Sequence, residues 1–341
     1  MKKKLLIRFP NWVGDTIMAL PTLDYLINQN KYHVFILIKE SLVPLINNTL
    51  GMENIITLSQ SEIHGILNKI KYSRMLNRHN FDECIILPPS FSSALLVFLA
   101  GIKIRKGYGC NCRSFLLTHV TKQPHPFDSM HLSAQYLKLA GNDSGIAASS
   151  GLKCIKGLEK ETVLGKYGLS CRRRYLGINP NANFSYTKMW PVERFAKAGE
   201  IICQKYNLIP VIFGGPGELE QSQRCASAIS GPSLILAGEK SPRLDELALV
   251  LSHMILFITN DTGPMHIAAA VKTPVVAVYG ATSPLWVHPA GEYSMAVYKD
   301  VECAPCHAKK CGNNMECMKA VSVDEVVRTG FELLDKICKL K

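Results

Sequence analysis

The chain has 341 residues, of which 47% are hydrophobic and 19% are charged, a composition typical of a globular protein with two domains of ordinary size. Its apolar stretches are all well short of the ~20 residues that a bilayer-spanning helix needs, so no transmembrane segment is predicted. The formal charge of +12 predicts attraction to an anionic partner. Because the basic residues are scattered and no nucleic-acid-binding motif accompanies them, a dedicated nucleic-acid binder is disfavoured.

Short apolar runs alternate with helical patterns through the first half of the chain. Leu5–Ile7 predicts a first strand and not an export signal, because Arg8 and Pro10 interrupt the apolar run. Residues 103–125 are basic, rich in glycine and contain cysteines, and Gly107-Tyr108-Gly109 within them is predicted as a loop. Further strands are expected over Val34–Ile38, Asn54–Leu58 and Glu83–Leu87, and helices over Thr16–Asn28, Val43–Ile46, Ser61–Leu76, Ser92–Ala100 and Asp128–Ala140. This alternation predicts an α/β fold with a parallel sheet.

The periodic pattern is lost between Gly141 and Arg174, and we place the domain linker there, close to Arg172. The predicted domains are therefore residues 1–172 and 173–321, followed by an amphipathic helix within residues 322–341, for which packing back on the first domain is one expectation. Alternation restarts at residue 175. Strands are predicted over Tyr175–Pro180, Ile209–Phe213, Leu234–Leu236 and Met254–Ile258, and helices over Val192–Tyr206, Leu219–Ile229 and Leu244–Ser252.

The stretch from Asn260 to Pro284 follows the last of these strands. Asn260–Gly263 has turn chemistry, Pro264–Val271 predicts a helix, and Val275–Tyr279 predicts a buried parallel strand. Ligands of open α/β sheets bind outside the carboxyl ends of strands, where a helix N-terminus offers free N–H groups to phosphate. The sequence therefore predicts an anion-binding loop, although the same residues would also serve simply as a helix N-cap.

Four of the twelve cysteines lie close together near the C-terminus. They are Cys303, Cys306, Cys311 and Cys317. Three alternatives remain open: a structural zinc site, disulfide pairing, or free thiols in a loop, because the spacing is tighter than that of the usual paired zinc knuckles. Most of the other cysteines stand singly in apolar or helical contexts, where cysteine behaves as a small hydrophobe and a reducing compartment is expected.

Four patches, in chain order, resemble the ADP-heptose:lipopolysaccharide heptosyltransferases, glycosyltransferase family nine. They are Asn11-Trp12-Val13-Gly14-Asp15, Lys188-Met189-Trp190-Pro191, Gly214-Gly215-Pro216-Gly217-Glu218, and Asn260-Asp261-Thr262-Gly263-Pro264-Met265-His266. The resemblance covers nearly the whole chain. The first patch and the cysteine cluster are most similar to the members that add the second heptose of the inner core.

The resemblance implies a GT-B architecture, with two Rossmann-like domains that face each other across a cleft. It implies inverting transfer of L-glycero-D-manno-heptose from ADP-heptose to the first heptose of heptosyl-Kdo2-lipid A, without a cofactor. The implied partners are ADP-heptose, the lipid A-core acceptor and, peripherally, the cytoplasmic face of the inner membrane. The alternatives are transfer to Kdo, as in heptosyltransferases of the first type, and a non-catalytic nucleotide- or glycan-binding protein on the same fold.

The resemblance also implies residue roles. Asp15 would be the catalytic base, although it could instead cap the first helix, and Gly14 would allow close backbone approach. Lys188 would bind phosphate and assist catalysis, although it could be a solvated loop lysine. Glu218 would bind the ribose; a first-turn glutamate that only satisfies the helix dipole is the alternative, and Glu220 is a rival for the contact.

The remaining implied ligands lie in the fourth patch. Thr262, Gly263 and the N–H groups that follow them would hold the diphosphate, Asp261 would bind sugar hydroxyls, and His266 would donate to a phosphate oxygen. Charge on the leaving group would be stabilised by these groups and not by a metal ion, in agreement with the absence of an Asp-x-Asp pair from the sequence.

Overall fold

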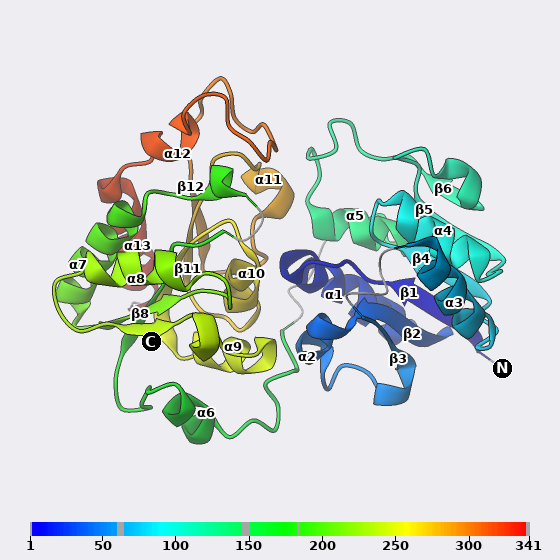
Figure 1. The fold of residues 1–341 in the computed structure, drawn as a ribbon, viewed down its shortest axis with the longest axis horizontal. Coiled ribbons are helices and arrows are strands. Elements are labelled where there is room, and N and C mark those ends of the chain that lie inside the picture. The colour runs from blue at the N-terminus through cyan, green and yellow to red at the C-terminus, as the bar shows by residue number, and fades with distance from the viewer. Residues whose placement is uncertain (1, 60–64, 145–150, 183–184, 339–341) are drawn as a thin grey trace. The chain divides into compact units, whose positions relative to one another are not determined.

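A computed structural model describes residues 2–59, 65–144, 151–182 and 185–338 (Figure 1). The chain forms two compact units, Met1–Cys154 and Ile155–Lys341. Each unit is built on its own parallel sheet, as the alternation of strand and helix predicts. The units divide earlier than the predicted linker at Arg172, so the segment just before Arg172 belongs to the second unit.

The first unit holds a six-stranded parallel sheet in the order β3-β2-β1-β4-β5-β6. The connections leave β1 in one direction and β4 in the other, which is the Rossmann arrangement. Its strands are β1 (Lys3–Arg8), β2 (Tyr32–Lys39), β3 (Ile55–Leu58), β4 (Glu83–Ile86), β5 (Ile104–Tyr108) and β6 (His119–Thr121). Its helices are α1 (Val13–Asn28), α2 (Val43–Ile46), α3 (Ile66–Asn77), α4 (Phe91–Leu99) and α5 (Leu132–Leu139).

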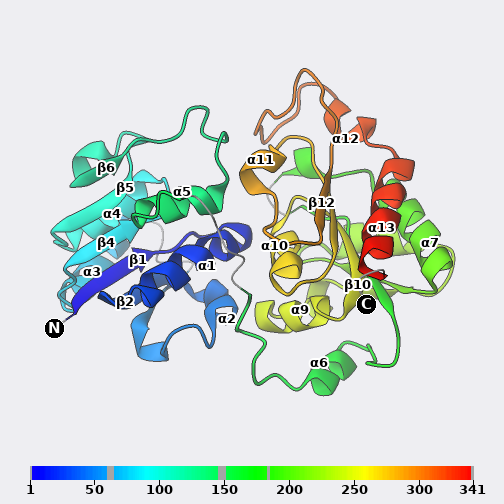
Figure 2. The ribbon, with the colours of Figure 1, turned by 180° about the vertical axis from the view of Figure 1, so that it is seen from behind.

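Both faces of this sheet are buried, because crossover connections place helices on each side. Leu6, Cys84 and Ile86 share one face and pack in a core with side chains of α3 and α4. Leu5 and Ile7 alternate to the other face and are also fully buried. The helices α1 and α5 pack against each other on that side (Figures 1 and 2).

The second unit repeats the topology, with the order β12-β11-β10-β7-β8-β9. Its strands are β7 (Tyr175–Asn179), β8 (Ile209–Phe213), β9 (Leu234–Leu236), β10 (Met254–Asn260), β11 (Val275–Val278) and β12 (Ser294–Val297). Its helices are α6 (Lys160–Lys166), α7 (Val192–Tyr206), α8 (Leu219–Ser227), α9 (Leu244–Leu251), α10 (Gly263–Ala270), α11 (Pro284–Val287), α12 (Glu316–Ala320) and α13 (Val323–Cys338).

The C-terminal helix α13 packs against α7, β11 and β12 of the second unit. Its buried residues, among them Val326 and Leu334, complete the core formed by α7 and the sheet of the second unit. Packing back on the first domain stays a prediction. Ser322 and Glu325 form a capping box, in which each side chain accepts a hydrogen bond from the other residue's backbone N–H. The helix thus begins at Val323; residues 339–341 lie outside the described ranges.

The largest departure from the predicted elements lies within residues 103–125, which contain β5 and β6. The first two residues of the predicted loop Gly107–Gly109 belong to β5. Arg105 and Lys106 hide the strand pattern because their long side chains are only half-buried. Gly107 lies within β5, where a Cβ would come within 3.2 Å of the Arg113 guanidinium, so this glycine serves close packing and not a turn. Of the helix predicted over Ser61–Leu76, residues 61–64 lie outside the described ranges.

Candidate functional site

In the second unit, the strand order reverses between β7 and β10, which lie side by side. Ligands of open α/β sheets bind outside the carboxyl ends of the strands at such a switch point. Two segments meet there: residues 179–181, where β7 ends, and residues 260–262, where β10 ends. The predicted phosphate loop therefore lies where the topology favours a ligand.

Asn260 joins these segments through its buried side chain. Its Oδ1 accepts a hydrogen bond from the backbone N–H of Trp190 at 2.9 Å, and its Nδ2 donates to the carbonyl oxygens of Pro180 at 3.0 Å and Asn181 at 3.3 Å. The sequence predicted Asn260 as a turn residue, but β10 extends through it. The residue fixes the loop that leads to Lys188 against the end of the strand.

We expect Asn260→Ala to destabilise the second unit. The substitution would leave three buried backbone groups without a partner, each costing roughly 1–3 kcal/mol, so a loss of about 3 kcal/mol in the free energy of unfolding is predicted. Urea denaturation followed by circular dichroism measures it. Asn313→Ala, at an exposed loop position, is the matched control. Equal stability of the two variants would contradict this structural role.

Lys188 and Asp261, both predicted ligand-binding residues, form an ion pair. Lys188 ends a short 3₁₀ helix (Tyr186–Lys188), and its Nζ lies 2.6 Å from Oδ2 of Asp261. The Asp261 side chain is only 7% exposed and that of Lys188 is 24% exposed. An ammonium group has three donor hydrogens, so Lys188 can hold Asp261 and still donate to a phosphate oxygen.

The helix α10 begins beside this pair. Thr262 is its N-cap residue, but the threonine side chain makes no capping hydrogen bond; its Oγ1 instead accepts from Nδ2 of Asn179 at 3.2 Å. The N–H of Gly263 and the positive end of the helix dipole therefore face the switch point without a side-chain cap. His266 lies one turn further on and is buried, with 4% exposure, so at most the edge of its ring could reach a ligand.

Glu218 lies in the loop after β8, immediately before α8. Its Oε2 accepts a hydrogen bond from the backbone N–H of Gly215 at 2.6 Å and so closes its own turn. The residue is half-buried, which leaves its other carboxylate oxygen for a ligand hydroxyl. Glu220, the rival residue, occupies the first turn of α8 and is exposed.

In the first unit, Asp15 lies in the first turn of α1, which begins at Val13 with Trp12 as its N-cap residue. The alternative that Asp15 caps a helix starting at Thr16 is therefore wrong, because Asp15 and Gly14 are both helical. The carboxylate is half-exposed. Burial, and to a lesser degree the negative charge of Asp15, raises the pKa of Tyr136 well above its ordinary value. Tyr136, on α5, is therefore close to Asp15. The sequence analysis missed it, because it stands within the apolar pattern of a helix.

Comparison with known proteins decides the family. Residues 70–316 match the profile described as "Glycosyltransferase family 9 (heptosyltransferase)". The chain belongs to glycosyltransferase family 9. Lipopolysaccharide heptosyltransferase 2 of Escherichia coli (strain K12) is 29% identical over 310 residues, 84% of this chain and 85% of that protein. Lipooligosaccharide heptosyltransferase 2 of Campylobacter jejuni is 26% identical over 337 residues, 97% of this chain and 98% of that protein.

The solved structure of Escherichia coli ADP-heptose lps heptosyltransferase II has a TM-score of 0.80 and 23% sequence identity, covering 98% of this chain and 99% of that chain. The likeness shows the fold. The predicted α/β class with two Rossmann-like units of GT-B type is thereby confirmed. As a member of glycosyltransferase family 9, the chain is a glycosyltransferase.

The cysteine cluster of this glycosyltransferase lines one small cavity of about 140 Å³. All four members contribute to its wall, namely Cys303, Cys306, Cys311 and Cys317. Each is a free thiol, and burial raises the pKa of Cys317. Within the described ranges, no three or more His, Cys, Asp or Glu side chains are arranged to hold a metal ion.

The loop that carries these cysteines also supports the segment before Lys188. The Oγ of Ser185 donates to the carbonyl oxygen of Lys309 at 2.9 Å, and Oγ1 of Thr187 donates to that of Ala308 at 2.8 Å. The backbone N–H of Cys311 donates to the hydroxyl of Tyr186 at 3.1 Å. The cysteine loop therefore positions the lysine of the candidate donor site.

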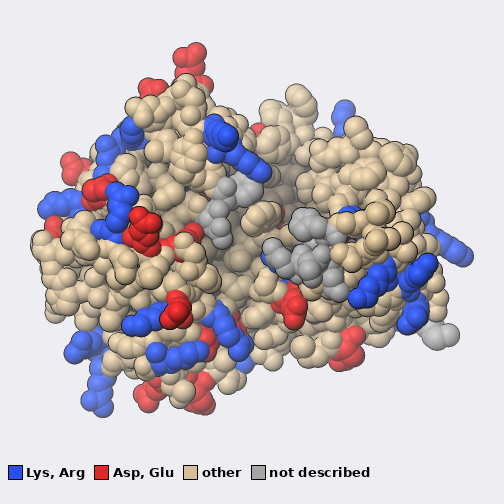
Figure 3. All heavy atoms as spheres, viewed as in Figure 1, with Lys and Arg blue, Asp and Glu red and all other residues tan. Residues whose placement is uncertain are grey.

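The surface of the family 9 chain shows basic and acidic side chains interspersed on the face drawn in Figure 3. The positive charge is thus distributed and forms no continuous basic stripe on this face, which agrees with the scattering of Lys and Arg along the sequence.

None of the helices that the structure describes is long and apolar enough to cross a bilayer.

Proposed function

We propose that the chain transfers L-glycero-D-manno-heptose from ADP-heptose to the first heptose of the inner core, on heptosyl-Kdo2-lipid A. The observation that carries the proposal is the match to proteins named heptosyltransferase 2, which extends in one case over 97% of this chain. The uncapped N-terminus of α10 and the neighbouring Lys188 agree with an ADP-sugar as donor, because both favour phosphate.

The second unit would bind the donor. Lys188 and the N–H of Gly263 would hold the diphosphate, with His266 beneath them on α10, and Glu218 would bind ribose hydroxyls through its free carboxylate oxygen. Asp261 would accept hydrogen bonds from the heptose hydroxyls while its other oxygen keeps Lys188 in place. Each contact is a proposal that rests on the positions of these groups around the switch point.

The first unit would supply the base. The Asp15 carboxylate takes the proton of the acceptor hydroxyl, whose oxygen attacks the anomeric carbon of the heptose. The bond from that carbon to the diphosphate oxygen breaks, and ADP leaves with the electron pair. One displacement of this kind inverts the anomeric configuration and forms no covalent enzyme intermediate. Lys188 and the α10 N-terminus would offset the charge that develops on the leaving oxygen.

Two purified acceptors test the function. The chain is incubated with ADP-heptose and either Kdo2-lipid A or heptosyl-Kdo2-lipid A, and the products are weighed by mass spectrometry. We expect one heptose to be added to the heptosyl acceptor. Addition to Kdo2-lipid A alone would support the alternative of transfer to Kdo. No product from either acceptor, with ADP-heptose bound, would support a non-catalytic binding protein.

We further propose a peripheral contact with the cytoplasmic face of the inner membrane. Phe91 and Phe98 lie seven residues apart on one side of α4 and are 41% and 44% exposed, and Phe115, 72% exposed, lies 6.2 Å from the Phe91 ring. Arg105 lies over the ring of Phe98. Exposed aromatic rings beside a cation fit the interface of an anionic bilayer.

Flotation with vesicles that contain anionic lipid measures this contact. Phe115→Ala should reduce the bound fraction, whereas Leu285→Ala, at a 64% exposed position in the second unit, should not. Equal binding of both variants and the unmodified chain would contradict the assignment of this surface. No nucleic acid is proposed as a partner.

A further inference from the structure

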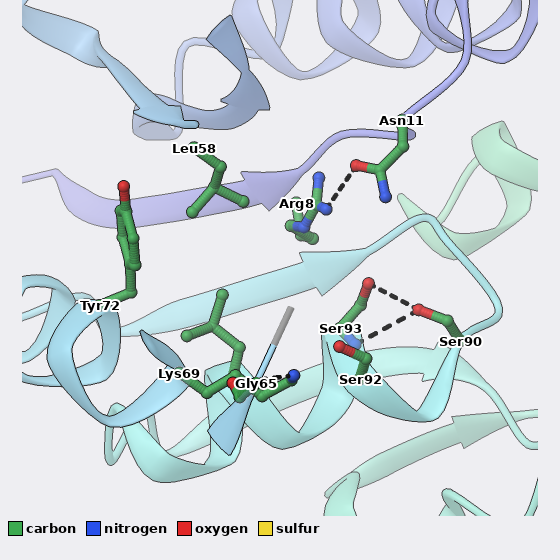
Figure 4. Close-up of a pocket in the computed structure, with 10 residues that line it drawn as sticks. Arg8, Asn11, Leu58, Gly65, Lys69, Tyr72, Ser90, Ser92 and Ser93 are labelled. Atoms are coloured by element: carbon green, nitrogen blue, oxygen red, sulfur yellow. Dashed lines mark hydrogen bonds between the residues drawn. The ribbon is translucent and has the colours of Figure 1, made fainter. Parts of the chain in front are cut away.

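The first unit contains a cavity of about 380 Å³ that none of the predicted ligand residues explains (Figure 4). It lies at the carboxyl ends of β1 and β3 and beside the loop after β4. Because β1 and β4 are neighbours whose connections run in opposite directions, this is the switch point of the first sheet. The polar residues that line it are Arg8, Asn11, Lys69, Tyr72, Ser90, Ser92 and Ser93.

Arg8, the last residue of β1, is a buried cation with 2% exposure. Its Nη2 donates to Oδ1 of Asn11 at 2.6 Å, and its Nη1 donates to the carbonyl oxygens of Phe9 and Leu37. Its Nε is buried and has no hydrogen-bond partner. Among the described residues, no carboxylate forms an ion pair with it. Burial lowers its pKa to about 10, so the guanidinium stays charged at neutral pH.

The opposite wall of the cavity is the N-terminus of α4. Ser90 is the N-cap residue, and its Oγ accepts a hydrogen bond from the N–H of Ser93 at 3.3 Å. Ser92 and Ser93 add hydroxyl groups, and Lys69 of α3 adds a second cation. Figure 4 shows the three serines across the cavity from Arg8 and Asn11. The described residues of the lining thus combine two cations, hydroxyl donors and the positive end of a helix dipole, and none of them is a carboxylate.

We propose that this cavity binds an oxyanion, either a carboxylate or a phosphoryl group, carried on the sugar acceptor. A buried guanidinium with an unused N–H and no counter-ion is costly unless a ligand supplies the missing charge. The loop that follows β1 contributes Asn11 to the cavity and leads directly into the helix that carries Asp15. Binding an anionic group of the acceptor here would therefore orient a neighbouring hydroxyl toward the base. The identity of the acceptor rests on the proposed function.

A charge placed in the cavity tests the site without disturbing the core. Ser92→Asp adds an anion at the second position of α4, where a first-turn carboxylate is favourable for the helix. Calorimetric titrations use three probes: inorganic phosphate, free Kdo as a sugar acid, and methyl mannoside as an uncharged sugar. We expect the unmodified chain to bind at least one of the two anions, and Ser92→Asp to weaken that binding at least about tenfold. Ser92→Asn, similar in size but neutral, should stay within about twofold.

Steady-state kinetics of a Lys69 variant provide a second test of the oxyanion site. Lys69→Met should raise the KM for the anionic acceptor about tenfold and leave kcat and the KM for ADP-heptose nearly unchanged, because the lysine binds without touching the reacting atoms. Lys71→Met, two positions along the same helix and outside the cavity, is the matched control and should behave as the unmodified chain.

The results of these experiments distinguish failure of the proposed oxyanion site from failure of the proposed function. Heptose transfer by a chain that binds neither anion, or anion binding that Ser92→Asp leaves intact, would overturn the oxyanion site while the proposed function stands. Anion binding that is lost in Ser92→Asp, in a chain that transfers no heptose, would support the site and contradict the proposed function. Preference for phosphate or for Kdo identifies which oxyanion the cavity takes.

Discussion

Replacing Asp15 should abolish heptose transfer while leaving donor binding intact. Loss of a general base costs roughly 10²–10⁴-fold in rate, and Asp15→Asn removes the base with almost no change in shape. Asp15 is half-exposed in the first turn of α1, so neither Asp15→Asn nor Asp15→Ala opens a core cavity. Initial rates with ADP-heptose and the heptosyl acceptor measure the effect on kcat, and calorimetry with ADP measures donor binding.

The control lies in the same helix. Asp24→Asn removes a carboxylate that pairs with Lys153 at 3.4 Å on the surface of the first unit. Because surface ion pairs contribute little, Asp24→Asn should retain nearly full activity and stability. Turnover by Asp15→Asn at a near-normal rate would show that another group takes the proton. Loss of folding in Asp15→Asn, seen by circular dichroism, would show a structural role instead.

Replacing Lys188 should weaken both donor binding and catalysis. Lys188→Met removes the ammonium group proposed to contact the diphosphate and leaves the buried Asp261 without its partner. Removing one electrostatic contact to a developing charge typically lowers kcat by about 10²–10³-fold. We expect a loss of about 10²-fold in kcat and a weaker affinity for ADP, measured by steady-state kinetics and calorimetry.

Asp261 complicates the interpretation of that variant, because an unpaired buried carboxylate is itself unfavourable. The double variant Lys188→Met with Asp261→Asn removes the orphaned charge. If Lys188 acts on the donor, the double variant stays inactive although its stability recovers. Recovery of activity together with stability would show that Lys188 serves only to neutralise Asp261. Lys197→Met, at an exposed pair on α7, is the matched lysine control.

The sequence predicted regular elements best where local signals agreed. The helix over Val192–Tyr206 has the predicted bounds, because Pro191 precedes it and Asn207, with φ of 51°, ends it in the left-handed region. The strand β5 was not predicted, because the two long basic side chains of Arg105 and Lys106 mask its alternation of apolar and polar residues. From the sequence alone, Gly107 indicates a turn. Only the structure shows that this glycine makes room for the buried side chain of Arg113.

Contacts between residues far apart in the chain could not be predicted from the sequence pattern. Lys188 and Asp261 were each predicted to bind ligand, but their pairing joins positions 73 residues apart and depends on strand β10 lying beside β7. Arg8 was predicted only to interrupt an apolar run. It lines a cavity because β4 lies beside β1, which brings the N-terminus of the helix after β4 close to Arg8. The sequence does not reveal this strand order.

The anomeric configuration of the product tests the central claim most directly, namely that this chain moves heptose from ADP-heptose in one inverting displacement. Product made from ADP-heptose labelled with ¹³C at the anomeric carbon is isolated on the heptosyl acceptor and examined by NMR. We expect a single new glycosidic signal with the configuration opposite to that of the donor. A retained configuration, or label that stays in ADP-heptose or is released as free sugar, would contradict it.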